Sequence, residues 1–94
     1  MVESWLFRVW GHVQGVGFRE SVVREARSRG LAGWVRNRLD GSVELQIQGS
    51  RQQLDAMRGW LREGDHPALV ERVDATPLPT PFHRFDRFDR LPTL

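Results

Sequence analysis

The 94-residue sequence predicts an α+β domain with one sheet and two helices, and three observations lead to this prediction. Two segments show the helical spacing of apolar residues, and four show the alternating or β-branched pattern of strands. Their order along the chain is strand, helix, strand, strand, helix, strand. An antiparallel sheet with both helices on one face accommodates this order, which is the ferredoxin-like βαββαβ arrangement. We expect a single domain over residues 1–94.

The N-terminal part of the chain begins with a strand pattern and changes to a helix pattern. Residues 4–11 alternate along their length and are rich in aromatic and β-branched side chains, which predicts a strand. From Phe18 onward the apolar residues follow a helical period. Gly30 is suited to the C′ position that ends this helix.

The middle of the chain predicts a hairpin followed by the second helix. Residues 33–37 and 43–48 are strand candidates, and Asp40-Gly41 between them is a hairpin turn signal. Ser50 with Gln53 predicts a capping box at the start of the second helix.

The C-terminal part is less regular. The second helix is expected to end near Gly64, and residues 68–75 predict the fourth strand. Prolines at 77, 79 and 81 form a stiff connector. Beyond them, an extra edge strand is expected over residues 83–88. We expect Trp34 and Trp60 in the core, and Trp10 either there or beside the acyl side of a pocket.

Composition limits the class of function. All 14 basic residues are arginine against 12 acidic ones, and the acidic residues are interspersed, which does not predict a nucleic-acid surface. There is no cysteine for disulfide or thiolate chemistry. The N-terminus has no basic leader and no apolar run reaches membrane-spanning length. We expect a cytoplasmic monomer without membrane or nucleic-acid partners.

The stretch between the first strand and the first helix, VWGHVQGVGFR, is the most informative. Backbone N–H groups at a helix start attract anions, and glycines let the backbone approach an oxyanion closely. Arg19 in the first helical turn can grip two phosphate oxygens. The stretch lacks the third glycine of GxGxxG and the Lys-Ser/Thr of a nucleotide P-loop. From spacing alone two interpretations remain: the stretch is a binding site for a small phosphate, or it is a tight turn with Arg19 in a surface ion pair.

Two longer patterns resemble a known family. Residues 9–19 resemble the first signature of the acylphosphatase family, and residues 33–37, followed by Gly41-Ser42-Val43 and Gly49, resemble its second. The resemblance covers roughly residues 4–75 and weakens over the tail. Glu20, an acid beside Arg19, departs from the residue expected there.

The resemblance implies a ferredoxin-like fold and hydrolysis of acyl phosphates to carboxylate and inorganic phosphate. By the same resemblance Arg19 is the phosphate-binding arginine and Asn37 orients the attacking water. The loop backbone would donate N–H groups from Gly15, Val16, Gly17, Phe18 and Arg19. No cofactor and no metal are expected, because a carboxylate leaves without a proton or a Lewis acid.

Other interpretations stay open. An acylphosphatase-like domain acting on carbamoyl phosphate would share this loop and Arg19. A non-catalytic ferredoxin-like RNA-binding module would use exposed aromatics such as Trp5, Phe7 and Trp10. The three histidines lack ligand spacing and are expected to be surface or hydrogen-bonded residues.

Overall fold

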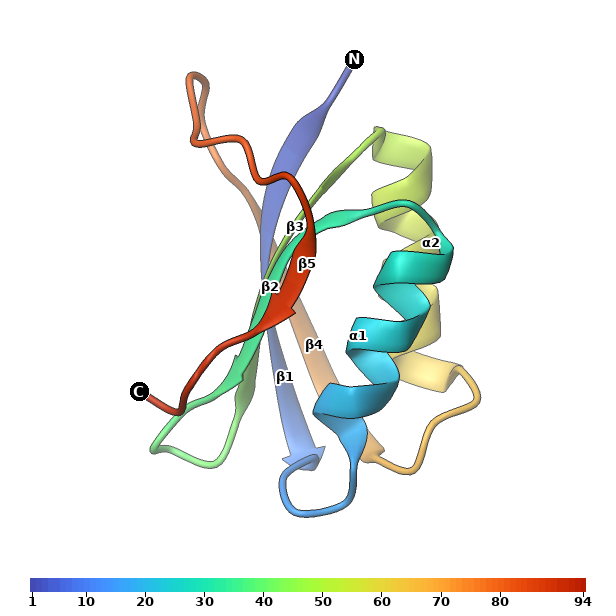
Figure 1. The fold of residues 1–94 in the computed structure, drawn as a ribbon. Helices are drawn as coiled ribbons and strands as arrows, with labels where there is room; N and C mark the ends of the chain where they lie inside the picture. The colour runs from blue at the N-terminus through green and yellow to red at the C-terminus, as the bar shows by residue number, and fades with distance from the viewer.

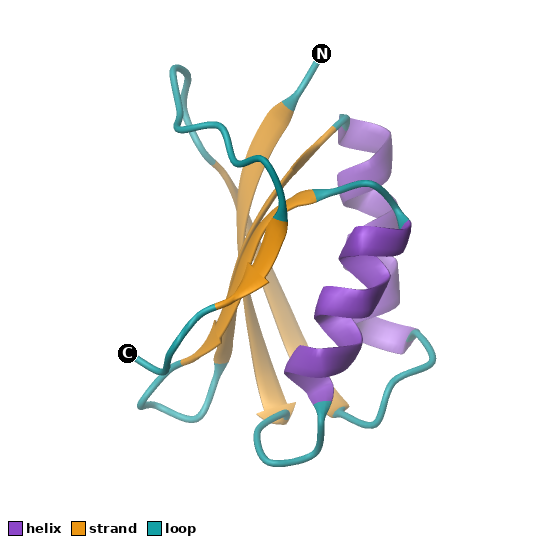
Figure 2. Ribbon diagram, viewed as in Figure 1, coloured by secondary structure: helices purple, strands orange, loops and turns teal.

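The computed structural model describes residues 1–94 and contains two helices packed on one face of a five-stranded sheet (Figures 1 and 2). The elements are β1 (Glu3–His12), α1 (Phe18–Ser28), β2 (Ala32–Asn37), β3 (Val43–Gly49), α2 (Arg51–Glu63), β4 (Leu69–Pro77) and β5 (Phe88–Arg90). The predicted order of elements and the ferredoxin-like α+β fold are confirmed.

The sheet has the strand order β4-β1-β3-β2-β5. The first four strands pair antiparallel, as predicted. The fifth strand exists and lies at the edge, but its predicted bounds are wrong, because it begins only at Phe88. It pairs parallel to β2, which makes the sheet mixed. The connector between β4 and β5 explains why β5 runs parallel to β2, because it crosses from one sheet edge to the other, past Gln48 of the central strand β3.

The core fills the space between the sheet and the helices. Alternate residues of β1 and β3, such as Phe7 and Leu45, pair across the strands and are fully buried. The helices add their apolar faces, including Val22 of α1 and Leu54 of α2. Neither helix combines the length and apolar composition needed to cross a membrane.

The helix ends follow the predicted signals. The Ser50 hydroxyl accepts from the Gln53 N–H at 3.1 Å and the Gln53 side chain accepts from the Ser50 N–H at 2.9 Å, which is the predicted capping box. Gly30 follows α1 with φ 70°, the left-handed conformation expected at a C′ position.

The tryptophans divide between the two sides of the sheet. Trp60 packs against the core, as predicted. The core placement predicted for Trp34 and Trp10 is wrong, because the strand alternation puts both on the face that no helix covers. There the Arg36 guanidinium lies 4.8 Å from the Trp34 ring centroid, and those of Arg8 and Arg72 lie 5.7 and 5.0 Å from that of Trp10. Cationic side chains thus cover these indoles in place of a helix.

Candidate active site

The turn from β1 into α1 presents free backbone donors at the start of a helix. Gly15 and Gly17 have φ of 73° and 83°, a conformation that other residues adopt only under strain. Gly17 is the N-cap of α1, and no side chain caps the helix. Val13 and Phe18 are both buried and anchor the two ends of the turn in the core. The N–H groups of the first turn are therefore held in place and available to an anion.

A small cavity of about 80 Å³ lies beside this turn. It is lined by Val13, Gly15, Gly17, Phe18, Arg19, Glu20, Asn37 and Arg90. The structure thus brings Arg19 and Asn37 together, although they come from a helix and from the end of a strand. Val16 does not line the cavity, and its side chain packs against the core instead. The volume suits a group of phosphate size rather than a whole nucleotide, since sites for larger ligands enclose roughly 300–1,000 Å³.

Arg19 differs from every other half-buried arginine of the chain. Four of the five have a carboxylate partner within 3.5 Å, namely Arg8, Arg29, Arg36 and Arg38. The fifth, Arg19, makes no side-chain hydrogen bond and no ion pair. Because a partly desolvated guanidinium without a partner favours an anion, Arg19 is suited to bind an anion that enters the cavity. The alternative of a surface ion pair is not what the structure contains.

Asn37 ends β2 and is almost entirely buried, with 9% of the residue exposed. Its Oδ1 has no hydrogen-bond partner. A buried acceptor left unpaired costs about 1–3 kcal/mol, so such an atom is expected to receive a donor from a ligand or a water.

The β2–β3 turn is closed by residues other than Asn37. The Asp40 carboxylate accepts from the Ser42 hydroxyl at 2.6 Å and from the Ser42 N–H at 3.0 Å. These two bonds, the hydroxyl first, hold the pKa of the Asp40 carboxyl below its usual value. Asn37 therefore has no side-chain role in this turn that would explain its presence.

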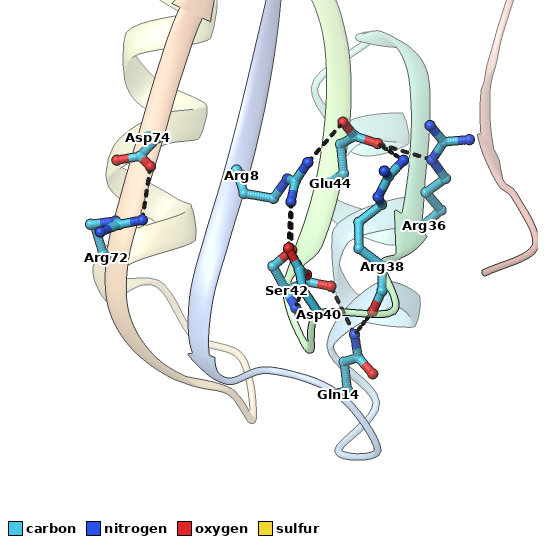
Figure 3. Close-up of polar contacts among 9 residues, drawn as sticks. All are labelled: Arg8, Gln14, Arg36, Arg38, Asp40, Ser42, Glu44, Arg72 and Asp74. Atoms are coloured by element: carbon cyan, nitrogen blue, oxygen red, sulfur yellow. Dashed lines mark hydrogen bonds and ion pairs between the residues drawn. The ribbon is translucent and has the colours of Figure 1, made fainter. Parts of the chain in front are cut away.

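Gln14 joins the β1–α1 turn to the hairpin that follows Asn37, a contact that the sequence did not indicate. Its Nε2 donates to the carbonyl oxygens of Arg38 and Ser42, both at 2.8 Å (Figure 3). The two carbonyls come from opposite sides of the hairpin turn, so one side-chain amide sets the distance between the turn and the residue next to Asn37.

A second contact missed from the sequence reaches the cavity from β5. Arg90 Nη1 lies 2.9 Å from Glu20 Oε1. The acid beside Arg19 is thus paired, but with a different arginine.

The histidines do not form a ligand set. Nε2 of His66 donates to the Leu61 carbonyl at 3.0 Å, while its Nδ1 accepts from the Ala68 N–H at 3.2 Å. The prediction of a hydrogen-bonded histidine is confirmed for this residue. His12 and His83 are exposed, and no group of three metal-ligating side chains is close enough to hold an ion.

The fold and the cavity define a small α+β protein with an arginine-lined cavity at a strand-to-helix turn. A family model described as acylphosphatase matches residues 5–89, and the chain belongs to that family. It is 57% identical to acylphosphatase 1 of Ralstonia nicotianae, over 95% of this chain and 87% of the relative. It is 52% identical to an acylphosphatase of Polaromonas naphthalenivorans, over 98% of this chain and 91% of the relative. The crystal structure of the acylphosphatase from Bacillus subtilis superposes with a TM-score of 0.87 at 35% identity, covering 97% of this chain and 99% of that one.

Proposed function

We propose that this chain is an acylphosphatase that hydrolyses acyl phosphates, in which Arg19 binds the phosphate and Asn37 positions the attacking water. One observation carries the assignment of roles: Arg19, a half-buried arginine without a partner, and Asn37, whose buried amide oxygen has none, line the same cavity at the start of a helix. Family membership supports the activity. The 94 residues would act as one catalytic domain.

The phosphate group would lie in the turn that precedes α1. Backbone N–H groups of residues 15–19 and the Arg19 guanidinium are donors suited to its oxygens, and the positive end of the helix dipole adds to them. Because the cavity is small, the acyl group would extend from it into solvent. This arrangement supports a site that selects for the phosphate and tolerates different acyl groups.

The chemistry needs little from the protein. Water attacks phosphorus, the bond between phosphorus and the acyl oxygen breaks, and carboxylate and inorganic phosphate leave. The conjugate acid of the leaving carboxylate has a pKa of about 4, so it departs without protonation. Charge on the equatorial oxygens of the transition state would be stabilised by Arg19 and the loop N–H groups, which are fixed in advance by the fold.

Asn37 is suited to positioning the attacking water. Its unpaired Oδ1 can accept a hydrogen bond from the water, which leaves a lone pair of the water oxygen directed at phosphorus. Asn37 is a poor proton acceptor, so the water's proton would pass to a phosphate oxygen of the substrate. Product release then requires only that inorganic phosphate leave an open cavity.

The test is a hydrolysis assay with an arylacyl phosphate in the presence and absence of EDTA. We expect turnover that EDTA does not reduce and competitive inhibition by inorganic phosphate. Phosphate should also raise the melting temperature, because it binds the native state.

Two outcomes of the same assay would contradict the proposal. Loss of activity on chelation, restored by Mg²⁺, would replace the mechanism by a metal-assisted one. The assay is also run with carbamoyl phosphate as the substrate. If carbamoyl phosphate is hydrolysed and arylacyl phosphates are not, the carbamoyl-specific alternative is favoured.

A further inference from the structure

The rim of the cavity carries a second arginine, Arg90, that the proposed mechanism does not use. Arg90 is the last residue of β5, and Glu20 is the residue after Arg19 in α1. Both residues line the cavity, and an ion pair of 2.9 Å joins Arg90 Nη1 to Glu20 Oε1. The two side chains are 48% and 65% exposed, so solvent reaches the pair.

The backbone that carries Arg90 is held firmly. Phe88, two residues earlier, is buried in the core with 1% exposure. The Phe88 carbonyl accepts from Arg27 Nε of α1 at 3.0 Å, and the Leu91 N–H donates to the Val35 carbonyl of β2 at 2.8 Å. Arg90 is therefore fixed beside the N-terminal end of α1 by its neighbours on both sides.

Glu20 presents an electrostatic problem for a phosphate site. A carboxylate in the first turn of a helix is favoured by the helix dipole, and so is a bound phosphate, so the two compete for the same positive potential. The negative charge of Glu20 also repels a phosphate dianion directly, so an uncompensated Glu20 would weaken phosphate binding.

We propose that Arg90 is a positioning residue that acts through Glu20, neutralising its charge beside the phosphate site. This inference rests on the proposed function, because it concerns the same phosphate site. Arg90 does not contact the phosphate in this account. At position 90 only a positive charge is required, whereas Arg19 must supply the planar guanidinium group.

The experiment measures the dissociation constant of inorganic phosphate, together with kcat and KM for an arylacyl phosphate, at an ionic strength of about 0.01 M. Arg90→Ala should weaken phosphate binding and raise KM by about three- to tenfold, with kcat changed less than about twofold. Arg90→Lys should stay close to the wild type. Raising the ionic strength to about 1 M should remove most of the difference, because the charges are exposed.

A double-mutant cycle separates action through Glu20 from direct contact. Glu20→Gln alone should bind phosphate at least as tightly as the wild type. The double variant of Arg90→Ala with Glu20→Gln should return to within about twofold of the wild type, because the rim charge is then the same. Arg87→Ala is the matched control: it removes an arginine from the same segment, paired with Asp89 at 3.1 Å and outside the cavity, and should change nothing.

Several results would overturn the inference. Arg90→Ala could leave phosphate binding unchanged, or the double variant could bind phosphate as weakly as Arg90→Ala alone, which would mean that the loss does not come from an uncompensated Glu20. Glu20→Gln could itself weaken binding, a result that does not depend on Arg90→Ala folding. If the wild type bound no phosphate at all, the proposed function would fail instead.

Discussion

Two regions of this molecule are rich in arginine, and they treat the guanidinium in opposite ways. On the open face of the sheet, Glu44 lies within 3.5 Å of three arginines, Arg8, Arg36 and Arg38 (Figure 3). In the cavity beside α1, Arg19 makes no ion pair, although Glu20 lines the same cavity. The first arrangement satisfies charge within the protein, and the second leaves charge for something else to satisfy.

We interpret this difference as one between structural arginines and an arginine that is available to a ligand. Glu44 is buried, with 6% exposure, and three cationic neighbours compensate its desolvation. Nothing comparable compensates Arg19, and its neighbour Glu20 is taken by Arg90. A folded protein tolerates such an unpartnered group where it serves a ligand.

The largest expected effect is at Arg19. Arg19→Ala should reduce turnover of an arylacyl phosphate by about 10²-fold or more, because several charge-assisted hydrogen bonds to the transition state are lost. Arg19→Lys should recover little, since it supplies a point charge without the fork. Steady-state kinetics measure both. Full activity of Arg19→Ala would contradict the distinction between the two regions.

Glu44 should matter for stability. Glu44→Ala should lower the free energy of unfolding by about 1–3 kcal/mol, because Arg36 and Arg38 lose their only carboxylate partner and Arg8 keeps only Asp40. Urea denaturation measures this change. The control is Asp74→Ala, which breaks an exposed 3.3 Å pair with Arg72 and should cost no more than about 0.5 kcal/mol. Equal costs for the two variants would mean that the Glu44 cluster is no more important than a surface pair.

A smaller effect is expected at Gln14, which connects the two regions. Gln14→Glu replaces the shared donor with an acceptor facing two carbonyl oxygens, and should lower turnover about tenfold by loosening the turn relative to Asn37. Gln52→Ala, an exposed position on α2, is the control and should keep full turnover. A Gln14 variant as active as that control would show that this bridge does not position the site.

Much of this structure was predictable because its signals are local. The capping box at Ser50 and the helix end at Gly30 follow from a few neighbouring residues. The order of elements then selects the fold. Arg19 and Asn37 were identified from two signatures in the sequence, and the fold places both at one cavity.

The parts that were missed depend on contacts between distant residues. The Arg90–Glu20 pair spans 70 positions and the Gln14–Ser42 bond spans 28, and no short pattern records either. Trp34 was expected in the core, and Trp10 there or beside a pocket, whereas strand alternation turns both toward guanidiniums on the other face. The late start and parallel pairing of β5 depend on where the proline connector crosses the sheet.

The most direct test of the account compares inorganic phosphate binding by the wild type, Arg19→Ala and Asn37→Ala, measured by calorimetry alongside turnover. Both variants should turn over arylacyl phosphate about 10²-fold more slowly, but their binding should differ. Arg19→Ala should lose phosphate binding, because in the proposed mechanism the unpaired guanidinium binds the phosphate. Asn37→Ala should keep phosphate affinity within about twofold, because in that mechanism its amide holds the water rather than the phosphate. Loss of binding in Asn37→Ala with binding retained in Arg19→Ala would contradict the assigned roles.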